Sequence, residues 1–400
     1  MTIKQTPEGF CVEEILTLEA QARIVEKPGL VAVYRLIKMR LTTPDAVAAV
    51  ARALGVPVGV VSYAGLKDKH AHTSQHVGVA FPAGQDAPVA VEGPNWQITR
   101  LGWSDEPLMS SAIAVNRFGI TVTGLLRKEV EQMDRSAELL AAPGAAKALR
   151  LVNYFGDQRF GSARHRRGFL AAHLVRGEFE QALKLAIATP ARKDRREDKD
   201  FKRTVAGGWG KWGSLLKQLP RCPERAAVET LAAGGDFRDA FAALPYLNQW
   251  LAVEAYQSHL WNLTARRLIE QFCPQAECIT APDPFGAMLF PPAAATPAAL
   301  VDLELPLLGR NSELREPWKA AAEAVLAEKG VTTSGLRIPG LRRPYFGEAP
   351  RRLFIDAGGF SMTAAKVEEA SARPERFSRV LTFDLPRGSY ATVLLRALGQ

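Results

Sequence analysis

The chain of 400 residues has few of the features that mark exported, membrane-spanning or metal-binding proteins. Its four cysteines are Cys11, Cys222, Cys273 and Cys278, and only the last two lie close together. A C-x4-C spacing without a neighbouring histidine is a poor zinc half-site, so we expect reduced thiols. No run reaches the roughly 18 apolar residues of a membrane-spanning helix. The start, MTIKQTPEGF, has no basic stretch before an apolar core, so we expect a cytoplasmic protein without an export signal.

What the chain does have is a globular composition and an excess of positive charge. Hydrophobic residues make up 47% and charged residues 23%, which fits a folded protein and no class of disordered chain. Lys and Arg number 51 against 42 Asp and Glu, a formal net charge of +9 at pH 7. This balance favours a polyanionic partner, with nucleic acid first. Four hundred residues exceed one ordinary core, so two domains are predicted.

Alternation of apolar and polar residues predicts strands over the first 125 residues. The predicted strands are 9–16, 29–41, 58–65, 76–84, 96–103 and 116–125. One helix interrupts them, with Thr43 as N-cap, Pro44 in the first turn and Gly55 as C-cap. Half-buried strands in succession indicate an α+β fold on a mainly antiparallel mixed sheet.

The pattern becomes helical after Phe160 and returns to strands from about Leu353. Helices are predicted at 165–188, 247–272 and 315–330. Acids nearly match bases in RKDRREDKDFKR (192–203), which we interpret as a solvated helix with internal ion pairs. The order strand, helix-rich, strand predicts a discontinuous sheet domain, 1–165 and 350–400, with 166–349 inserted in it.

The segment YAGLKDKHAHTSQ (63–75) contains one carboxylate, Asp68, between Lys67 and Lys69. Neighbouring cations favour the ionised form of such a carboxylate. An ionised aspartate can be a covalent nucleophile toward a sugar carbon, a general base or a metal ligand. A solvated loop of mixed charge is the structural alternative.

Three histidines follow Asp68, namely His70, His72 and His76, and they raise the alternative of a metal-dependent nuclease. H-x-H on a strand places two rings on one face. No Glu, Cys or second Asp nearby completes a ligand set with Asp68, so we predict no metal site. Contacts with an RNA backbone, or plain surface positions, fit these histidines better.

The segment VNYFGDQRFG (152–161) interleaves rings with polar groups. Asn153 can read the edge of a uracil or hold a loop. The rings, Phe155 among them, can stack on an extruded base or fill the core. Arg159 can bind phosphate or pair with a carboxylate.

Further cations lie in two short segments. SARHRRG (162–168) supplies Arg164, Arg166 and Arg167, which can neutralise phosphates without reading sequence. DLPRGSYATVLLRAL, near the C-terminus, adds Arg387 as a phosphate candidate and Tyr390, which can line a pocket or pack.

Taken in order, these segments resemble the motifs of the TruD-type tRNA pseudouridine synthases. The matching segments are KQTPEGFCVEEI, AGLKDKHAHTSQ, NRF, NYFGDQRFG, AYQSHLWN and DLPRGSYATVLLRAL, and they span nearly the whole chain. The resemblance implies a split synthase domain carrying an inserted helix-rich α/β domain, the TRUD domain. It also implies that a tRNA uridine, at position 13 in tRNA numbering, becomes pseudouridine without a cofactor, a membrane or an obligate protein partner.

The resemblance also assigns roles to single residues. Asp68 falls on the catalytic aspartate, the nucleophile of the family. Phe10, Asn153 and Tyr390 fall on positions that contact the flipped uridine. Phe155 matches a ring that stands where other synthase families carry a tyrosine.

Two lysines are candidates for the cation opposite Asp68: its neighbour Lys67, and Lys4, which matches a family lysine upstream of Phe10. Gly9 departs from the family, because an acidic residue is usual there. The alternative function is a non-catalytic RNA-binding or tRNA-folding protein that uses the same rings and arginines.

Overall fold

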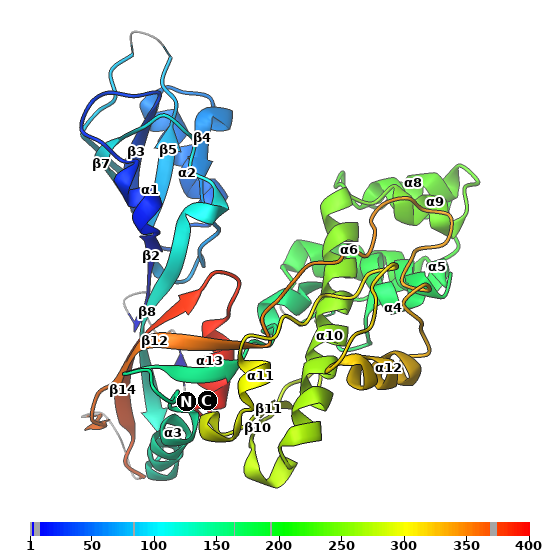
Figure 1. Cartoon of the computed structure of the whole chain (residues 1–400). Coiled ribbons are helices and arrows are strands. Elements are labelled where there is room, and N and C mark those ends of the chain that lie inside the picture. Colours follow the sequence, from blue (N-terminus) through cyan, green and yellow to red (C-terminus); the bar gives the residue numbers. More distant parts are fainter. Residues whose placement is uncertain (1, 4–8, 83–84, 164, 193, 369–373) are drawn as a thin grey trace. The chain divides into compact units, whose positions relative to one another are not determined.

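A computed structural model of the chain describes residues 2–3, 9–82, 85–163, 165–192, 194–368 and 374–400. Two compact units make up the chain (Figure 1). The first comprises Met1–Leu151 and Ile355–Gln400, and the second is Val152–Phe354. In sequence, the second unit is thus an insertion in the first. Its limits are 152 and 354, whereas the limits expected from the sequence were 166 and 349.

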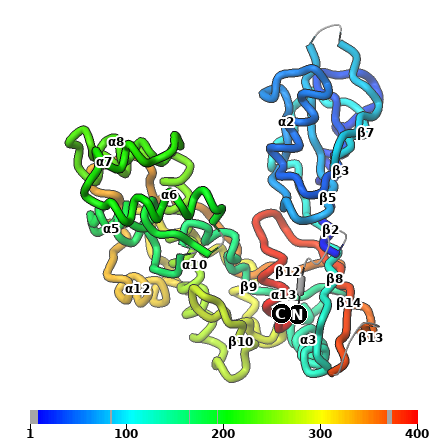
Figure 2. Tube along the Cα trace, turned by 180° about the vertical axis from the view of Figure 1, so that it is seen from behind, coloured from blue at the N-terminus to red at the C-terminus, as the bar shows by residue number. Residues whose placement is uncertain are grey.

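Twelve strands of the described residues form one sheet in the order β6-β7-β3-β5-β2-β8-β14-β12-β9, with β1 beside β8, β13 beside β14 and β4 beside β5. They are β1 Thr2–Ile3, β2 Phe10–Leu16, β3 Val31–Lys38, β4 Val61–Tyr63, β5 His72–Val79, β6 Ala90–Gly93, β7 Trp96–Ser104, β8 Ile113–Leu125, β9 Leu149–Val152, β12 Phe354–Met362, β13 Lys366–Val367 and β14 Phe377–Pro386. β9 and β12 lie side by side (Figure 2). A mainly antiparallel mixed sheet with many helices confirms the predicted α+β class.

One strand pair decides what lies near the Asp68 loop. β2 and β5 run parallel, with Cys11 opposite His72, whereas β5 runs antiparallel to β3. Both β2 and β5 therefore begin, and β3 ends, at the same end of the sheet. Phe10, Lys38 and the loop that leads into His72 come together there.

The helices of the first unit are α1 Leu18–Ala22, α2 Thr43–Leu54, α3 Arg127–Leu140 and α13 Ala391–Ala397. α2 packs its apolar face on β3, β5 and β7 (Figure 1). Gly55 ends α2 at φ 67°, which confirms the predicted C-cap. The predicted N-cap, Thr43, was wrong: Thr42 has the extended backbone of a cap, and its Oγ1 accepts the N–H of Asp45 at 3.2 Å.

The second unit is rich in helices. They are α4 Leu170–Val175, α5 Phe179–Ile187, α6 Arg196–Gly207, α7 Trp212–Leu216, α8 Arg225–Ala232, α9 Phe237–Ala242, α10 Tyr246–Phe272, α11 Ala298–Val301 and α12 Lys319–Glu328, with the hairpin β10 Ile279–Ala281 and β11 Met288–Phe290. In Figure 1, α10 runs from one end of this unit to the other. No helix among the described residues is long and apolar enough to cross a membrane.

One predicted helix of this unit is two helices. The apolar period of 165–188 continues through the break, but α4 ends before Gly177, whose φ of 73° is left-handed. Glycine takes this backbone conformation without strain, so the chain turns there before α5. The charged run 192–203 does enter a helix, α6, in which Arg203 pairs with Asp200 at 3.3 Å as expected.

Candidate active site

The residues singled out from the sequence are divided between the two units. Phe10, Lys67, Asp68, Arg387 and Tyr390 belong to the first unit, and Asn153, Phe155, Arg159, Arg166 and Arg167 to the second. Lys4 and Arg164 lie outside the described residues.

Asp68 lies half-buried in the loop between β4 and β5. Its Oδ1 accepts the backbone N–H of His70 at 2.8 Å. An aspartate that bonds the backbone two residues ahead stabilises its own turn. The carboxylate therefore has a fixed direction relative to the loop that carries it.

Buried side chains from other elements hold the backbone of this loop. Thr43 Oγ1 accepts the N–H of Lys67 at 2.9 Å and donates to Gln75 Oε1 at 3.0 Å. Gln75 Nε2 in turn donates to the carbonyl of Gly65 at 3.2 Å. Thr43 and Gln75 are at most 1% exposed. The position of Asp68 is thus set from both α2 and β5.

Lys38 is a further residue beneath the loop, and sequence reasoning missed it. At 1% exposure, its Nζ donates to the carbonyls of Leu41 at 2.9 Å and Asp68 at 3.2 Å. Burial lowers the pKa of Lys38 to about 8, and the negative charge of Asp68 opposes that shift. The sequence does contain a signal for Lys38. Alternation along the strand places Lys38 on the same buried face of β3 as Tyr34 and Leu36.

Lys67 points to a different carboxylate, that of Glu14. Lys67 Nζ lies 2.6 Å from Glu14 Oε2, and both side chains are nearly inaccessible. Glu14 Oε1 also accepts the backbone N–H of His76 at 3.0 Å. Burial raises the pKa of Glu14, but the hydrogen bonds from His76 and the Lys67 ammonium outweigh it, so the pKa is below its ordinary value.

Glu14 was also missed, although it lies on the buried face of β2 with Phe10 and Val12. Among the described residues, no group of three or more His, Cys, Asp or Glu side chains is placed to hold a metal ion. His76, one of the three histidines of the motif, has its Nδ1 3.2 Å from Glu14 Oε1.

Phe10 begins β2 of the first unit's sheet, whereas Tyr390 lies outside the sheet, between β14 and α13. Phe10 is buried, with its ring edge-on to Phe118 at 6.3 Å between centroids. β14 ends at Pro386 opposite Val115, whereas Phe10 pairs with Ile120 of the same strand. Tyr390 follows, half-exposed, directly before α13, after a turn that includes the exposed Arg387. The sheet register alone does not bring Tyr390 to Phe10.

In the second unit, Arg351 fixes the side chain of Asn153. Arg351 donates to the Asn153 carbonyl and to its Oδ1, both at 2.8 Å. Asn153 Nδ2 donates to the carbonyl of Arg352 at 3.2 Å. From the sequence, Asn153 could either read the edge of a uracil or hold a loop. The contacts that hold a loop are present.

Phe155 is surrounded by the same network. The Arg351 guanidinium lies 3.9 Å from the centre of its ring, and Trp261 is edge-on at 5.6 Å. Asn262 of α10 accepts the N–H of Phe155 at 2.8 Å and donates to its carbonyl at 3.0 Å. The AYQSHLWN segment thus anchors the NYFGDQRFG segment, a relation that sequence spacing does not reveal.

Of the arginine candidates, Arg159 has a carboxylate partner. Its NH1 lies 2.5 Å from Glu254, and its Nε donates to Ser258 at 3.0 Å. Arg166 and Arg167, by contrast, are exposed.

Comparison with known proteins identifies the family of the chain. The family model for tRNA pseudouridine synthase D (TruD) matches residues 1–281. A curated tRNA pseudouridine synthase D of Aquifex aeolicus is 31% identical over 406 aligned residues, 99% of this chain and 97% of that protein. A curated protein of the same name from Leptospira interrogans is 24% identical, covering 99% and 95%. A solved structure from Methanosarcina mazei, described as a TruD protein, matches with a TM-score of 0.71 and 25% identity over 99% and 92% of the two chains.

These matches define an isomerase of the pseudouridine synthase class. Within that class, the chain belongs to the tRNA pseudouridine synthase D (TruD) family. This membership confirms the resemblance drawn from the sequence motifs.

Proposed function

We propose that this enzyme converts a uridine of tRNA, at position 13 in tRNA numbering, to pseudouridine, with Asp68 as the nucleophile. The observation that carries the proposal is the support of the Asp68 loop by buried Thr43, Gln75 and Lys38. A solvated loop of mixed charge needs no such support. A nucleophile does, because a reacting group must be held near its attacking geometry.

In the proposed reaction the uridine first leaves its stack, at a cost of roughly a few kcal/mol. The bond between N1 of uracil and the anomeric carbon then breaks while the Asp68 carboxylate captures the sugar. The freed uracil rotates, its C5 bonds to the same carbon, and the C5 proton leaves as N1 gains one. Atoms and charge balance, so product and substrate have the same mass.

The rings and polar groups of the family motifs take the supporting roles. Stacking on a ring recovers roughly 1–3 kcal/mol per base, which offsets part of the cost of flipping. Phe10, Phe155 and Tyr390 are proposed as these rings. Asn153 is proposed to hydrogen-bond uracil, and this role depends on Arg351, which orients its amide.

A cation opposite Asp68 keeps the carboxylate ionised before it attacks. Lys4 and Lys67 are the candidates from the sequence, and Lys67 also pairs with Glu14. We add Lys38, whose pKa responds to the charge of Asp68.

The two units also receive proposed assignments. The first is the synthase domain and the second the inserted TRUD domain, acting on tRNA in the cytoplasm without a cofactor. Arg164, Arg166, Arg167 and Arg387 are the proposed contacts to phosphates, and Arg159 joins them only if it leaves Glu254.

The experiment is pseudouridine mapping on an unmodified tRNA transcript by carbodiimide treatment and primer extension. We expect one enzyme-dependent stop, at position 13, with the wild-type protein. Asp68→Asn is expected to abolish the stop and to change tRNA affinity by less than about tenfold, or 1.4 kcal/mol. Asp86→Asn, which removes an exposed carboxylate elsewhere in the first unit, is the matched control and should retain activity.

Other outcomes would overturn specific parts of the proposal. Loss of tRNA binding together with loss of product in Asp68→Asn would mark Asp68 as structural. Binding without any product by the wild-type protein would favour the non-catalytic alternative. A single stop at another uridine would support the proposed reaction but show that position 13 is not the uridine that is converted.

A further inference from the structure

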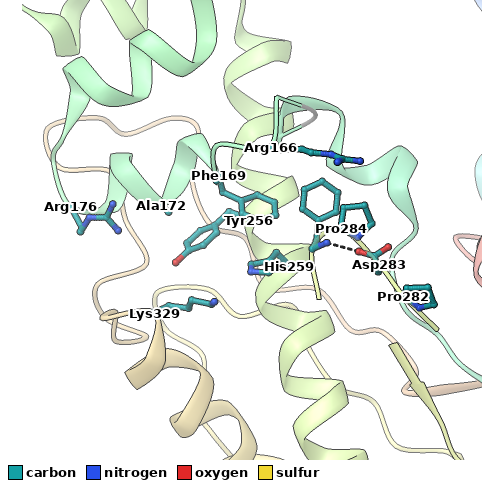
Figure 3. Close-up of a pocket in the computed structure, with 12 residues that line it drawn as sticks. Arg166, Phe169, Ala172, Arg176, Tyr256, His259, Pro282, Asp283, Pro284 and Lys329 are labelled. Carbon is teal, nitrogen blue, oxygen red and sulfur yellow. Dashed lines mark hydrogen bonds between the residues drawn. The ribbon is translucent and has the colours of Figure 1, made fainter. Parts of the chain in front are cut away.

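A cavity of about 710 Å³ lies wholly within the second unit, and of its lining residues only Arg166 has a role in the function proposed above (Figure 3). Among the residues that line it are Arg166, Phe169, Tyr256, His259, Phe285 and Lys329. The lining residues come from the start and end of α4, the middle of α10, the chain after α12 and the segment before β11. Its volume falls in the range of about 300–1,000 Å³ typical of small-ligand sites.

Aromatic rings form a continuous wall of this cavity. Phe169 stacks on His259, with centroids 4.4 Å apart and planes 22° apart. Phe285 lies 5.5 Å from Phe169, and Tyr256 lies 5.9 Å from it. Of these rings Phe285 is half-exposed, and an exposed ring held by such packing is a surface on which proteins stack unpaired bases.

His259 takes part in this wall as a neutral ring. Burial, and after it the charge of Lys329, lowers the pKa of His259 to about 4. Its Nδ1 has no hydrogen-bond partner in the described part of the chain, so stacking on Phe169 holds the ring. A buried polar atom left unsatisfied is rare in native proteins.

Positive charge surrounds the rings. Arg166, Arg176 and Lys329 line the cavity, against one carboxylate, Asp283. Arg176 is paired with Glu178 at 2.8 Å, and Lys329 lies 3.0 Å from Glu328. The Arg166 guanidinium has no ion pair or hydrogen bond among the described residues, which leaves it available to an anion.

The mouth of the cavity has a defined backbone. Arg166 has a left-handed φ of 59° and Gly168 a φ of 92°, in the turn that precedes α4. Asp283 Oδ1 accepts the N–H of Phe285 at 2.8 Å, the dashed line in Figure 3. This bond fixes the short segment that presents the Phe285 ring.

We propose that this cavity binds one unpaired nucleotide of the RNA substrate, distinct from the uridine that is isomerised. The base would stack on the half-exposed ring of Phe285, which the buried pair Phe169 and His259 supports, and its phosphate would face Arg166 and Lys329. The proposal rests on the proposed function in that tRNA is the ligand. A free mononucleotide has the same chemistry, so the experiment must separate the two sources.

The test uses the full chain carrying Asp68→Asn, so that RNA is bound but not converted. Affinity for an unmodified tRNA transcript is measured for Arg166→Ala/Lys329→Ala and for Phe285→Ala. Arg221→Ala and Tyr345→Ala are matched controls, because these exposed side chains of the same unit lie outside the cavity. Binding of AMP and UMP is measured in parallel, and 4-thiouridine-substituted tRNA is photocrosslinked to the protein.

We expect each cavity variant to weaken tRNA binding at least about fivefold relative to its control, as loss of one stacked base or of phosphate contacts would. The double variant should also lower the salt dependence of binding, by roughly 0.7 in the log–log slope per lost contact. Crosslinked peptides should contain residues from 166–176 or 282–285. Pseudouridine formation is not a readout here, so failure of the proposed reaction would leave these results intact.

Three results would overturn the proposal. Cavity variants that bind tRNA like their controls would remove the site from RNA recognition. Crosslinks confined to other segments would do the same. Tight binding of AMP or UMP, lost in the cavity variants while tRNA affinity is kept, would assign the cavity to a free nucleotide.

Discussion

At the scale of single residues, the support for Asp68 consists of buried polar side chains that satisfy one another. Lys38 and Glu14 are at most 1% exposed, an expensive placement for charged groups unless they are paired. Lys38 donates to the loop carbonyls, and Glu14 accepts from Lys67 and His76. Through these contacts, buried charged groups fix the position of one loop. Such an arrangement is expected where the position of a side chain matters for chemistry.

The pKa of Lys38 leads to a pH prediction. Because that pKa is about 8, the Lys38 ammonium, which donates to the Asp68 carbonyl, loses its proton as pH rises above this value. We expect the turnover number for pseudouridine formation to fall as pH increases through about 8. Lys38→Arg keeps its charge throughout this range, so its profile should lack the alkaline fall whatever its overall rate. The measurement is a rate profile from about pH 7 to about pH 9.5.

Folding stability should change in the opposite direction. The folded-state pKa of Lys38 lies below its ordinary value of 10.5. The unfolded chain therefore binds more protons between about pH 8 and 10.5, and the free energy of unfolding that Lys38 contributes rises with pH there. Loss of activity at alkaline pH with no loss of stability relative to Lys38→Arg would support deprotonation of Lys38 as the cause. Parallel loss of activity and stability would contradict it.

At the scale of elements, the start of α2 divides two tasks between adjacent threonines. Thr42 caps the helix through Asp45, whereas Thr43 binds the Lys67 N–H and Gln75. Helix propensity and capping rules alone do not separate them, because both have the same side chain. Only the packing of α2 against β5 turns Thr43 toward the loop.

This division predicts different effects of two substitutions. Thr42→Ala should cost about 1 kcal/mol of stability, with activity unchanged under conditions where the protein stays folded. Thr43→Val keeps the shape but removes the hydroxyl, so activity should fall at least about tenfold because the Asp68 loop loses its support. Denaturant unfolding and single-turnover rates measure the two. Equal activity losses in both variants would refute the separation.

At the scale of the whole molecule, two units with separate cores are joined by two passages of one chain. Proteins of more than one domain commonly depart from all-or-none unfolding. In sequence, the proposed tRNA-binding residues Arg166 and Arg167 belong to the second unit and the Asp68 loop to the first.

We therefore predict two thermal transitions by calorimetry. Leu268→Ala, in the buried face of α10, should lower one transition, with a cost of about 2–5 kcal/mol. Leu36→Ala, in β3 of the first unit, is the matched control and should lower the other. A single transition lowered by both variants would mean that the units unfold together.

Much of the fold followed from local patterns. Alternation located the strand before the Asp68 motif, and Gly55 located the end of α2, but the strand predicted at 76–84 was placed too late, because β5 is His72–Val79. The break at Gly177 was missed because the apolar period continues across it, and a left-handed backbone is decided by the packing of the two helices.

The missed residues share one property, which is distance along the chain from the group they hold. Arg351 contacts Asn153 across 198 positions, and Lys38 contacts Asp68 across 30. No spacing rule connects such pairs. A charged residue on the apolar face of a strand was the available signal for Lys38 and Glu14.

By itself, the sequence determined the family, through motifs that resemble it in order along nearly the whole chain, and the alternation that builds the sheet, because both depend on residue types and their short-range order. The tertiary structure decided which buried groups hold the Asp68 loop, that Arg159 pairs with Glu254, and that rings and cations from four segments meet in one cavity. Such contacts form only when distant segments share a core, since burial removes water and makes each polar group depend on a protein partner.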